Sequence, residues 1–432
     1  MLLFLLLMGM ISTFDKDPTF SESEKRQLKT LPKLTISGLL DGNYFNEFRA
    51  YFADTFPGRE SLMEKNTSLN AFYYFSGLSG SNSEQLVINF DTNAAQHGQA
   101  LQNPDATTPV ETKPQEEEEE VPKITEPAAT PEQLGNVILV GDRAMDVPYG
   151  DTTKIKRYAA AVNTLANLLG DDVQTFSMPV PNSAEFYAGK NWNTGKYSQK
   201  AMFETLQENL GENVTYVDAY SVLAKHTDEY IYFRTDHHWT HQGAYYAYTA
   251  LCKAAGFTAE PQSKFATGKW ENFVGSMYTY ISSYPQSAIL KENPDTVHYW
   301  KPNADCTTYY YSNTDLNDGV LMGTICVIRE EVDNKYLTFM GGDHPVTIVT
   351  TDTEGPCIMV IKESYGNALI SWLTSHYSKI ILIDPREYFD NRSDIDLKAF
   401  AESQGVDQLL VINYPMMLNS DNYITLLERL AK

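Results

Sequence analysis

Residues 358–369 read Ile358-Met-Val-Ile-Lys-Glu-Ser-Tyr-Gly-Asn-Ala-Leu369, an apolar run followed by a short polar stretch. A continuous apolar run of four residues is typical of a strand that is buried on both faces. A helical pattern follows it, so the polar residues between form a strand-to-helix turn. Ser364 stands in that turn, where the N–H groups at the start of a helix would face a developing oxyanion. The segment therefore predicts one strand-turn-helix unit of an α/β sheet.

The same alternation of apolar runs and helical patterns extends over residues 136–432. Further strands are predicted at residues 137–140, 173–178, 214–217, 380–383 and 409–412. Helices are predicted at about 153–169, 197–210, 241–255, 366–377, 397–404 and 421–431. Between about 257 and 355, where Tyr, Thr and Asn dominate, we expect an insertion of strands and loops. This order predicts an α/β fold with a mostly parallel sheet flanked by helices.

Three segments with different compositions precede this domain. Residues 1–11 are apolar but shorter than the ~20 residues of a membrane span, which predicts part of a signal peptide or signal anchor; a buried helix is the alternative. Residues 12–97 form a predicted helical N-terminal region, because Phe45, Phe48 and Phe52 share one helix face. Residues 98–135 combine six prolines with the acidic run Glu116–Glu120, which predicts a disordered linker.

Charge and cysteine content limit the functions that the chain can have. The 432 residues include 56 acidic and 33 basic side chains, a formal charge of −23, which argues against nucleic acid as a partner. The 28 tyrosines would suit a partly wet sugar groove. The four cysteines are too few for a disulfide framework or a CxxC metal site, although Cys306 and Cys326 could pair in an oxidising compartment.

The densest group of polar residues is Phe233-Arg-Thr-Asp-His-His-Trp-Thr-His241, directly before a predicted helix. In an open α/β sheet such a position lies at the ligand crevice. Asp236 stands two residues before His238, so its carboxylate could fix the tautomer of that imidazole and leave the other nitrogen as a base. An alternative is a metal site of Asp236, His237 and His241, although no second ligand group at metal-like spacing occurs elsewhere.

A base of this kind needs a nucleophile, and Ser364 is the best candidate. The competing interpretation is that Ser364 only caps a helix. Gly341 and Gly342 could supply an oxyanion N–H, or could simply form a hairpin turn. Arg234 and Tyr365 could hold substrate, or could be structural hydrogen-bonding residues. Trp239 is expected to pack behind the histidine loop.

The segment Thr235-Asp-His-His-Trp-Thr240 resembles the signature of the DHHW family, and is similar to the Asp-x-His-Trp motif of alginate O-acetyltransferases and related SGNH-hydrolase-like envelope proteins. Further similar segments are Phe52-Ala-Asp-Thr-Phe-Pro-Gly-Arg59, Gly141-Asp-Arg143, Tyr336-Leu-Thr-Phe-Met-Gly-Gly-Asp-His-Pro345, Lys362-Glu-Ser-Tyr-Gly-Asn-Ala368 and Ile383-Asp-Pro-Arg386.

The resemblance implies an SGNH-like (flavodoxin-like) domain in which Ser364 is the nucleophile, His238 the base and Asp236 its orienting group. The order of the motifs differs from that in SGNH hydrolases. Those proteins carry the nucleophile in an early Gly-Asp-Ser block, whereas the corresponding residues here are Gly141-Asp142-Arg143.

The resemblance further implies an envelope-associated O-acetyltransferase or acetylesterase. Its substrate would be an extracellular or cell-wall glycan or another acylated small molecule. We expect an extracytoplasmic location, membrane-anchored or secreted, possible cooperation with a membrane acyl-donor protein, and no cofactor or metal. The alternative is a glycan-binding or scaffold protein that keeps the fold without the chemistry. Hydrogen-bond contact between Ser364 and His238 would favour the enzyme, whereas a separation beyond ~8 Å would favour the scaffold.

Overall fold

The computed structural model describes residues 20–21, 26–27, 51, 129–325, 330, 332–389 and 394–432. The chain divides into two compact units, Met1–Ser79 and Gly80–Lys432. In the first unit, β1 (Phe20–Ser21) and β2 (Arg26–Gln27) pair antiparallel. All of the elements described below belong to the second unit.

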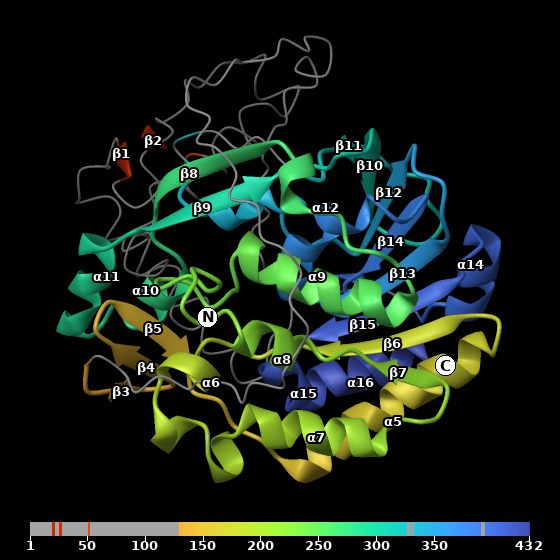
Figure 1. Cartoon of the computed structure of the whole chain (residues 1–432). Helices are drawn as coiled ribbons and strands as arrows, with labels where there is room; N and C mark the ends of the chain where they lie inside the picture. The colour runs from red at the N-terminus through yellow and green to blue at the C-terminus, as the bar shows by residue number, and fades with distance from the viewer. Residues whose placement is uncertain are drawn as a thin grey trace, which may run out of the picture. The chain divides into compact units, whose positions relative to one another are not determined.

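The largest sheet has eight strands in the spatial order β11-β10-β12-β14-β13-β15-β6-β7 (Figure 1). Its parallel strands are β6 (Gln174–Pro179), β7 (Val214–Tyr216), β13 (Cys357–Lys362), β14 (Lys379–Ile383) and β15 (Gln408–Asn413). Antiparallel strands extend the sheet beyond β14: β10 (Cys306–Tyr311), β11 (Val320–Met322) and β12 (Val346–Thr351). Every residue of β13 and β15 is buried, which explains their apolar runs. The predicted mostly parallel α/β sheet is therefore confirmed.

The order of the parallel strands locates the crevice of the sheet. Counted as β13, β14, β15, β6 and β7, these strands have the spatial order 2-1-3-4-5, which is that of flavodoxin-like sheets. The chain is thus a circular permutation of that arrangement. Ligands bind such sheets outside the carboxyl ends of the strands, where the order reverses. Here that point lies between β13 and β15, and Ser364 stands two residues after the end of β13.

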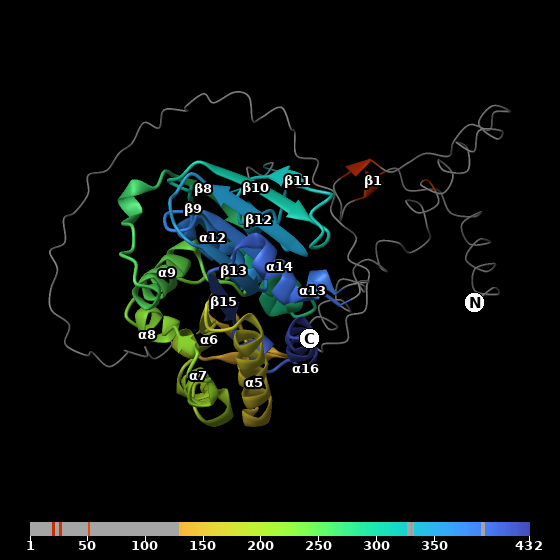
Figure 2. The ribbon, with the colours of Figure 1, turned by 90° about the vertical axis from the view of Figure 1, so that its right-hand side faces the viewer.

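Helices cover both faces of the parallel strands. Figure 2 shows α8 (Ala219–Ala224) and α9 (His241–Ala255) on one side, and α14 (Leu397–Gln404) and α16 (Asp421–Leu430) on the other. α5 (Thr152–Leu169) packs against both α14 and α16, and α7 (Gln199–Asn209) packs on α5. The chain after β13 forms η7 (Ser364–Leu369) and α12 (Ile370–Leu373), both in contact with α9. The helix predicted at 366–377 is thus shorter and begins as a 3-10 turn.

The length of α5 follows from local signals. The Asp151 carboxylate accepts the main-chain N–H groups of Thr153 and Lys154, and Gly170 ends the helix. Buried side chains recur at helical spacing and form the face toward the sheet: Tyr158, Val162, Leu165 and Leu169.

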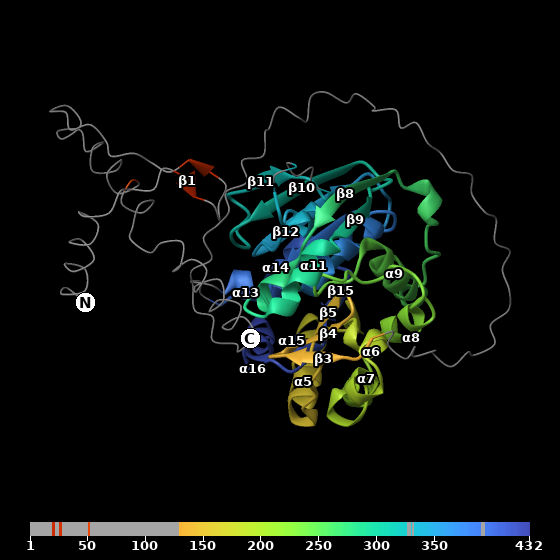
Figure 3. The ribbon, with the colours of Figure 1, turned by 90° about the vertical axis from the view of Figure 1, so that its left-hand side faces the viewer.

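The predicted strand at 137–140 does not belong to the large sheet. It forms β4 (Val137–Val140), which pairs antiparallel with β3 (Glu132–Leu134) and β5 (Arg143–Asp146) in a separate sheet, gold in Figure 3. A short apolar run does not reveal its partner, but the Gly141-Asp142 pair between β4 and β5 is a hairpin signal that the sequence contained. β3 also lies within the stretch predicted as linker, so regular structure begins before residue 135.

The segment at about 257–355 contains a hairpin and part of the large sheet. β8 (Thr267–Phe273) pairs antiparallel with β9 (Asp295–Trp300), and the connection between them carries α10 (Ser276–Tyr280) and α11 (Ala288–Glu292). The segment then supplies β10, β11 and β12, and β12 pairs directly with β14. Its last strand is therefore an integral part of the large sheet.

Several predictions for the N-terminal part lie outside the described residues. They include the segment 1–11, the linker up to residue 128 and the helical region 12–97, apart from β1, β2 and the helical residue Tyr51. Cys326, the proposed partner of Cys306, is also outside them. None of the helices within the described ranges is long and apolar enough to span a membrane.

Candidate active site

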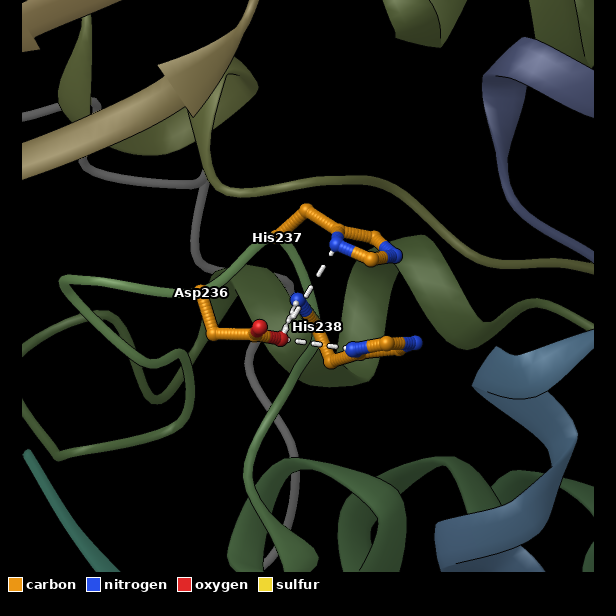
Figure 4. Close-up of side chains that lie close together, drawn as sticks. All are labelled: Asp236, His237 and His238. Atoms are coloured by element: carbon orange, nitrogen blue, oxygen red, sulfur yellow. Dashed lines mark hydrogen bonds and ion pairs between the residues drawn. The ribbon is translucent and has the colours of Figure 1, made fainter. Parts of the chain in front are cut away.

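The polar segment before α9 is a narrow loop at the crevice edge of the sheet. A bridge between Tyr232 and Trp239 closes its base, and the N–H of Phe233 donates to the carbonyl of His238. The Thr240 side chain caps α9 by accepting the N–H of Gly243. This closure places Asp236, His237 and His238 together at the tip of the loop (Figure 4).

The structure brings together the three residues that the sequence proposed as a catalytic group. His238 Nδ1 lies 2.6 Å from Asp236 Oδ1, and His238 Nε2 lies 2.8 Å from Ser364 Oγ. The Nδ1–H donates to the carboxylate, so Nε2 of the neutral ring is free to accept the serine proton. The sequence separation of His238 and Ser364 is 126 residues, and the permuted sheet is what joins them.

The Asp236 carboxylate is held as an ionised acceptor. Oδ1 also accepts the main-chain N–H of His238, and Oδ2 accepts both the N–H and the hydroxyl of Ser276 at 2.8 and 2.9 Å. Burial alone would raise the pKa of Asp236, but His238, His237 and the hydrogen bonds from His238 and Ser276 keep it well below its usual range.

Gly275 permits this close approach of the α10 segment to the carboxylate. A Cβ at this position would lie 2.3 Å from the Cβ of Asp236 and 2.5 Å from its Oδ2. Only glycine lets the main chain bring the Ser276 N–H onto Asp236 without displacing it.

Ser364 is not the helix cap that the competing interpretation required. The N-cap of η7 is Glu363, whose buried carboxylate accepts the N–H of Tyr365 at 2.9 Å. Ser364 is the first residue of η7, and it is the one residue between Cys357 and Thr374 that is not buried. Its side chain is therefore the part of this segment that a substrate can reach.

Two aromatic residues connect the histidine loop to the serine turn. The Tyr336 ring stacks on His238, with ring centroids 3.8 Å apart and planes 10° from parallel, and its hydroxyl donates to the carbonyl of Ser364 at 3.0 Å. Trp239 is fully buried, as expected, and its indole N–H donates to the carbonyl of Tyr365 at 2.9 Å. Tyr336 belongs to one of the segments that resemble the family, but its position in the sequence did not indicate a contact with His238.

Asp295 fixes the first part of the loop, and the sequence gave no signal for it. Its buried carboxylate accepts the main-chain N–H groups of Arg234 and Thr235, the Thr235 hydroxyl and the Tyr230 hydroxyl. Arg143 of the early Gly-Asp-Arg block donates to the carbonyls of Tyr232 and Phe233. The block that lacks a serine thus braces the catalytic loop.

Arg234 and Tyr365, two of the four residues proposed to hold substrate or an oxyanion, make hydrogen bonds within the protein. The Arg234 guanidinium contacts Asp142 Oδ2 at 2.6 Å, Asp295 and the carbonyl of Pro294, which favours its structural interpretation. Tyr365 is buried, stacks on Tyr414 and donates its hydroxyl to the carbonyl of His237.

Gly341 and Gly342 form a tight left-handed turn, with φ of 67° and 107° after Met340 at 60°. The Gly342 N–H donates within this turn to the carbonyl of Phe339. The loop is connected to the serine turn by Asp343, which accepts from Lys362 Nζ and Asn367 Nδ2 at 2.8 Å each. Arg386 also donates to Asp343, so residues of three of the segments that resemble the family meet at Asp343.

The metal site proposed from Asp236, His237 and His241 is not assembled. Both nitrogens of the buried His241 are engaged elsewhere, Nε2 with the Ser371 hydroxyl and Nδ1 with the N–H of Trp300. Asp236, His237 and His238 do present ligand atoms within 4.8 Å of one another. The Asp236 oxygens, however, already accept four donors, and His238 Nδ1 is one of them.

The protein has an SGNH-like α/β fold, with its Asp-His pair and serine in permuted order. The chain belongs to the DHHW family: the family model for DHHW proteins matches residues 24–79 and 99–383. No match was found among curated proteins.

Several solved structures are similar to this chain. A DHHW family protein from Eubacterium siraeum DSM 15702 is 28% identical with a TM-score of 0.59, covering 68% of this chain and 97% of its own. PatB1 from Bacillus cereus has 18% identity and a TM-score of 0.52, with 66% and 98% covered. The O-acetyltransferase domain of Pseudomonas putida AlgJ has 13% identity and a TM-score of 0.39, with 68% and 96% covered.

Proposed function

We propose that this protein is a serine acyl-ester enzyme, an O-acetyltransferase or acetylesterase, that acts through Ser364, His238 and Asp236. The observation that carries the proposal is the continuous hydrogen-bonded series from Asp236 Oδ1 through His238 to Ser364 Oγ, with steps of 2.6 and 2.8 Å. A separation within hydrogen-bond reach is the geometry that a base and its nucleophile require. It supports the enzyme over the non-catalytic scaffold.

The series supports a two-step acyl transfer. Ser364 Oγ attacks the carbonyl carbon of an ester while His238 Nε2 takes its proton, and the imidazolium then gives that proton to the departing alkoxide. An acyl ester of Ser364 results. Water or a hydroxyl group then attacks this ester by the reverse proton route and regenerates the serine. Asp236 stabilises the imidazolium in both steps.

The oxyanion of each tetrahedral intermediate needs donors near Ser364. Two N–H groups that follow the serine are occupied, because Tyr365 donates to the carboxylate of Glu363 and Gly366 donates to its carbonyl. The N–H of Ser364 itself has no acceptor among the residues that the structure describes. We assign this N–H as one oxyanion donor.

The proposed substrate is an acylated glycan or another small ester outside the cytoplasm. This part rests on the resemblance of the Asp-x-His-Trp motif to alginate O-acetyltransferases and on the apolar residues 1–11. A membrane protein that supplies acyl groups is the partner that such a transferase would need. The net charge of −23 favours a neutral substrate over a polyanion.

The first experiment is the release of p-nitrophenol from p-nitrophenyl acetate by the purified protein and by Ser364→Ala and His238→Ala. We expect both variants to lose activity, and a serine-directed sulfonyl fluoride to modify Ser364 in the wild type. Wild-type turnover retained by Ser364→Ala would refute the assignment. Absence of both turnover and labelling would favour a binding protein, and stoichiometric bound metal on elemental analysis would favour the metal site.

A further inference from the structure

We propose that His237 Nε2 and the Asp146 carboxylate form a subsite for the acyl acceptor, which binds a polyol such as a sugar through two of its hydroxyl groups. This inference rests on the proposed function, since it names the molecule that takes the acyl group from Ser364. His237 and Asp146 have no part in the Asp236–His238–Ser364 series itself. Each side chain has an acceptor atom without a hydrogen-bond donor among the described residues.

The hydrogen bonds around Ser276 determine which nitrogen of His237 is free. The single hydroxyl proton of Ser276 goes to Asp236 Oδ2, since an ionised carboxylate only accepts. The 2.6 Å contact between His237 Nδ1 and Ser276 Oγ must therefore be donated by the histidine. Burial, followed by the effect of His238, lowers the pKa of His237 to about 4. The neutral ring then presents Nε2 as a hydrogen-bond acceptor.

The free nitrogen of His237 faces the side on which the nucleophile lies. Figure 4 shows the His237 and His238 rings extending from Asp236 in the same direction, with the Nε2 atoms at their far ends. The two ring centroids are 3.8 Å apart, and His238 Nε2 contacts Ser364. The His237 side chain is 15% exposed, and its Nε2 has no hydrogen-bond partner among the described residues.

Asp146 is the second unused acceptor. It ends β5, whose Ala144 N–H donates to the carbonyl of Arg234 in the catalytic loop. The residue is 3% exposed, yet its carboxylate makes no hydrogen bond within the described part of the chain and is not fully enclosed. A buried carboxylate without a donor is costly, which indicates that a ligand or water supplies one.

β5 lies close to the His237 loop, because its Ala144 N–H donates to the Arg234 carbonyl and because α10, which contacts β5, carries the Tyr280 ring 6.4 Å from that of His237. Asp146 and His237 are near enough for each to influence the pKa of the other. Burial raises the pKa of Asp146 to about 6, and its next largest influences are His237 and Asp236. The same carboxylate acts on the pKa of His237, Tyr365 and Tyr414. Above pH 7, Asp146 is therefore ionised and only accepts hydrogen bonds.

The chemistry of this subsite selects hydroxyl donors. Two acceptors without donors, one of them anionic, disfavour carboxylates and phosphates and favour a neutral ligand with several O–H groups. The rings of Tyr280 and Tyr414 lie 6.4 and 5.9 Å from that of His237, and both residues are half-buried. Such aromatic groups with polar tips suit a sugar, which has both apolar faces and hydroxyl edges.

His238 and Ser364 supply the proton route that the transfer step needs. The acceptor oxygen forms a bond to the acyl carbon, and the bond from that carbon to Ser364 Oγ breaks. The acceptor proton passes to His238 Nε2 and from there to Ser364 Oγ, which restores the hydroxyl. Asp146 and His237 hold neighbouring hydroxyls of the acceptor and so favour it over water.

The test measures how acetyl groups divide between glycerol and water. The protein is incubated at pH 8 with p-nitrophenyl acetate and glycerol, and acetylglycerol and acetate are quantified. This ratio does not depend on how fast the acyl enzyme forms. We expect acetylglycerol from the wild type, and a ratio at least about tenfold lower in Asp146→Asn and His237→Asn, since each loses a charged or well-placed acceptor.

Matched variants separate the subsite from a general loss of structure. Asparagine at 237 can still donate to Ser276 but lacks an acceptor at the Nε2 position, whereas His237→Gln places one there and should restore part of the ratio. Asp172→Asn, at an exposed position, should leave it unchanged. An unchanged ratio in Asp146→Asn and His237→Asn, or hydrolysis without any acetylglycerol in the wild type, would overturn the inference.

Failure of the proposed function has a different signature. In that case the wild type releases no p-nitrophenol, and saturation-transfer NMR with glycerol then measures the subsite directly. A signal that is lost in Asp146→Asn would support the subsite, and equal signals would overturn it.

Discussion

Gly275→Ala should reduce activity strongly although it changes none of the proposed catalytic residues. The new Cβ would stand 2.3 Å from the Cβ of Asp236 and 2.5 Å from its Oδ2, whereas ordinary contacts begin at about 3.4 Å. The neighbouring atoms are the buried carboxylate and main chain, so relief requires a movement of roughly 1 Å, which is enough to break the 2.6 Å contact with His238.

A displacement of that size in a catalytic group costs about 10²-fold in rate. We therefore expect kcat/KM for p-nitrophenyl acetate to fall about 100-fold, while overpacking lowers the free energy of unfolding by about 1–3 kcal/mol. The variant should still unfold cooperatively in a thermal melt, which shows that the loss is local.

The control is Gly211→Ala, where the added Cβ meets Asn213 Oδ1 at 3.1 Å, the end of a flexible side chain. It should retain wild-type activity. If Gly275→Ala keeps half or more of the wild-type kcat/KM, then the position of Asp236 does not control the reaction, and the reasoning from this close approach is wrong.

Two further predictions concern Tyr336 and Glu363. Tyr336→Phe keeps the ring that stacks on His238 but removes the hydrogen bond to the Ser364 carbonyl. The loss of about 1 kcal/mol should lower kcat/KM about fivefold, and Tyr336→Leu should lower it further. Equal activity of the wild type and both variants would contradict a positioning role. Burial raises the pKa of Glu363 to about 7. Between about pH 4.5 and pH 7 the folded state therefore keeps a proton that the unfolded state has released. The free energy of unfolding falls as the pH rises through this range. The difference in unfolding free energy between wild type and Glu363→Gln, measured with denaturant at pH 5 and pH 8, should change by about 2.5 kcal/mol in the direction that disfavours the wild type at pH 8. A constant difference would show that Glu363 titrates normally.

Local patterns in the sequence were sufficient to predict the strands of the parallel sheet and the contact between Asp236 and His238. Buried strands such as β13 and β15 carry their signal in consecutive residues, and the Asp-x-His spacing is itself local. The placement of Ser364 beside His238 needed the family resemblance, because no periodicity links residues so far apart in the chain.

The residues that sequence reasoning missed act through distant contacts. Asp295 binds the loop from 60 and 61 residues away, and Arg143 from 89 and 90. A lone Asp at the first position of a strand or a Tyr in a 3-10 turn has no local feature that distinguishes it from many others. β4, the central strand of the separate three-stranded sheet, was misplaced for a related reason, since its four apolar residues do not indicate whether the partner strands are parallel or antiparallel.

The permuted order explains why a serine-free Gly-Asp-Arg block and a late serine are compatible with the same site. In a 2-1-3-4-5 sheet the first and third strands flank the crevice, and here these strands are β13 and β15. The chain from β7 to α9 supplies the Asp-His loop, and the chain after β13 supplies the serine, so both arrive at the carboxyl edge whichever comes first. The early block is then free to act as a brace, and Arg143 and Asp142 hold the loop through its carbonyls and through Arg234. Position in the chain therefore carries less information about a residue's role at this site than its position in the sheet.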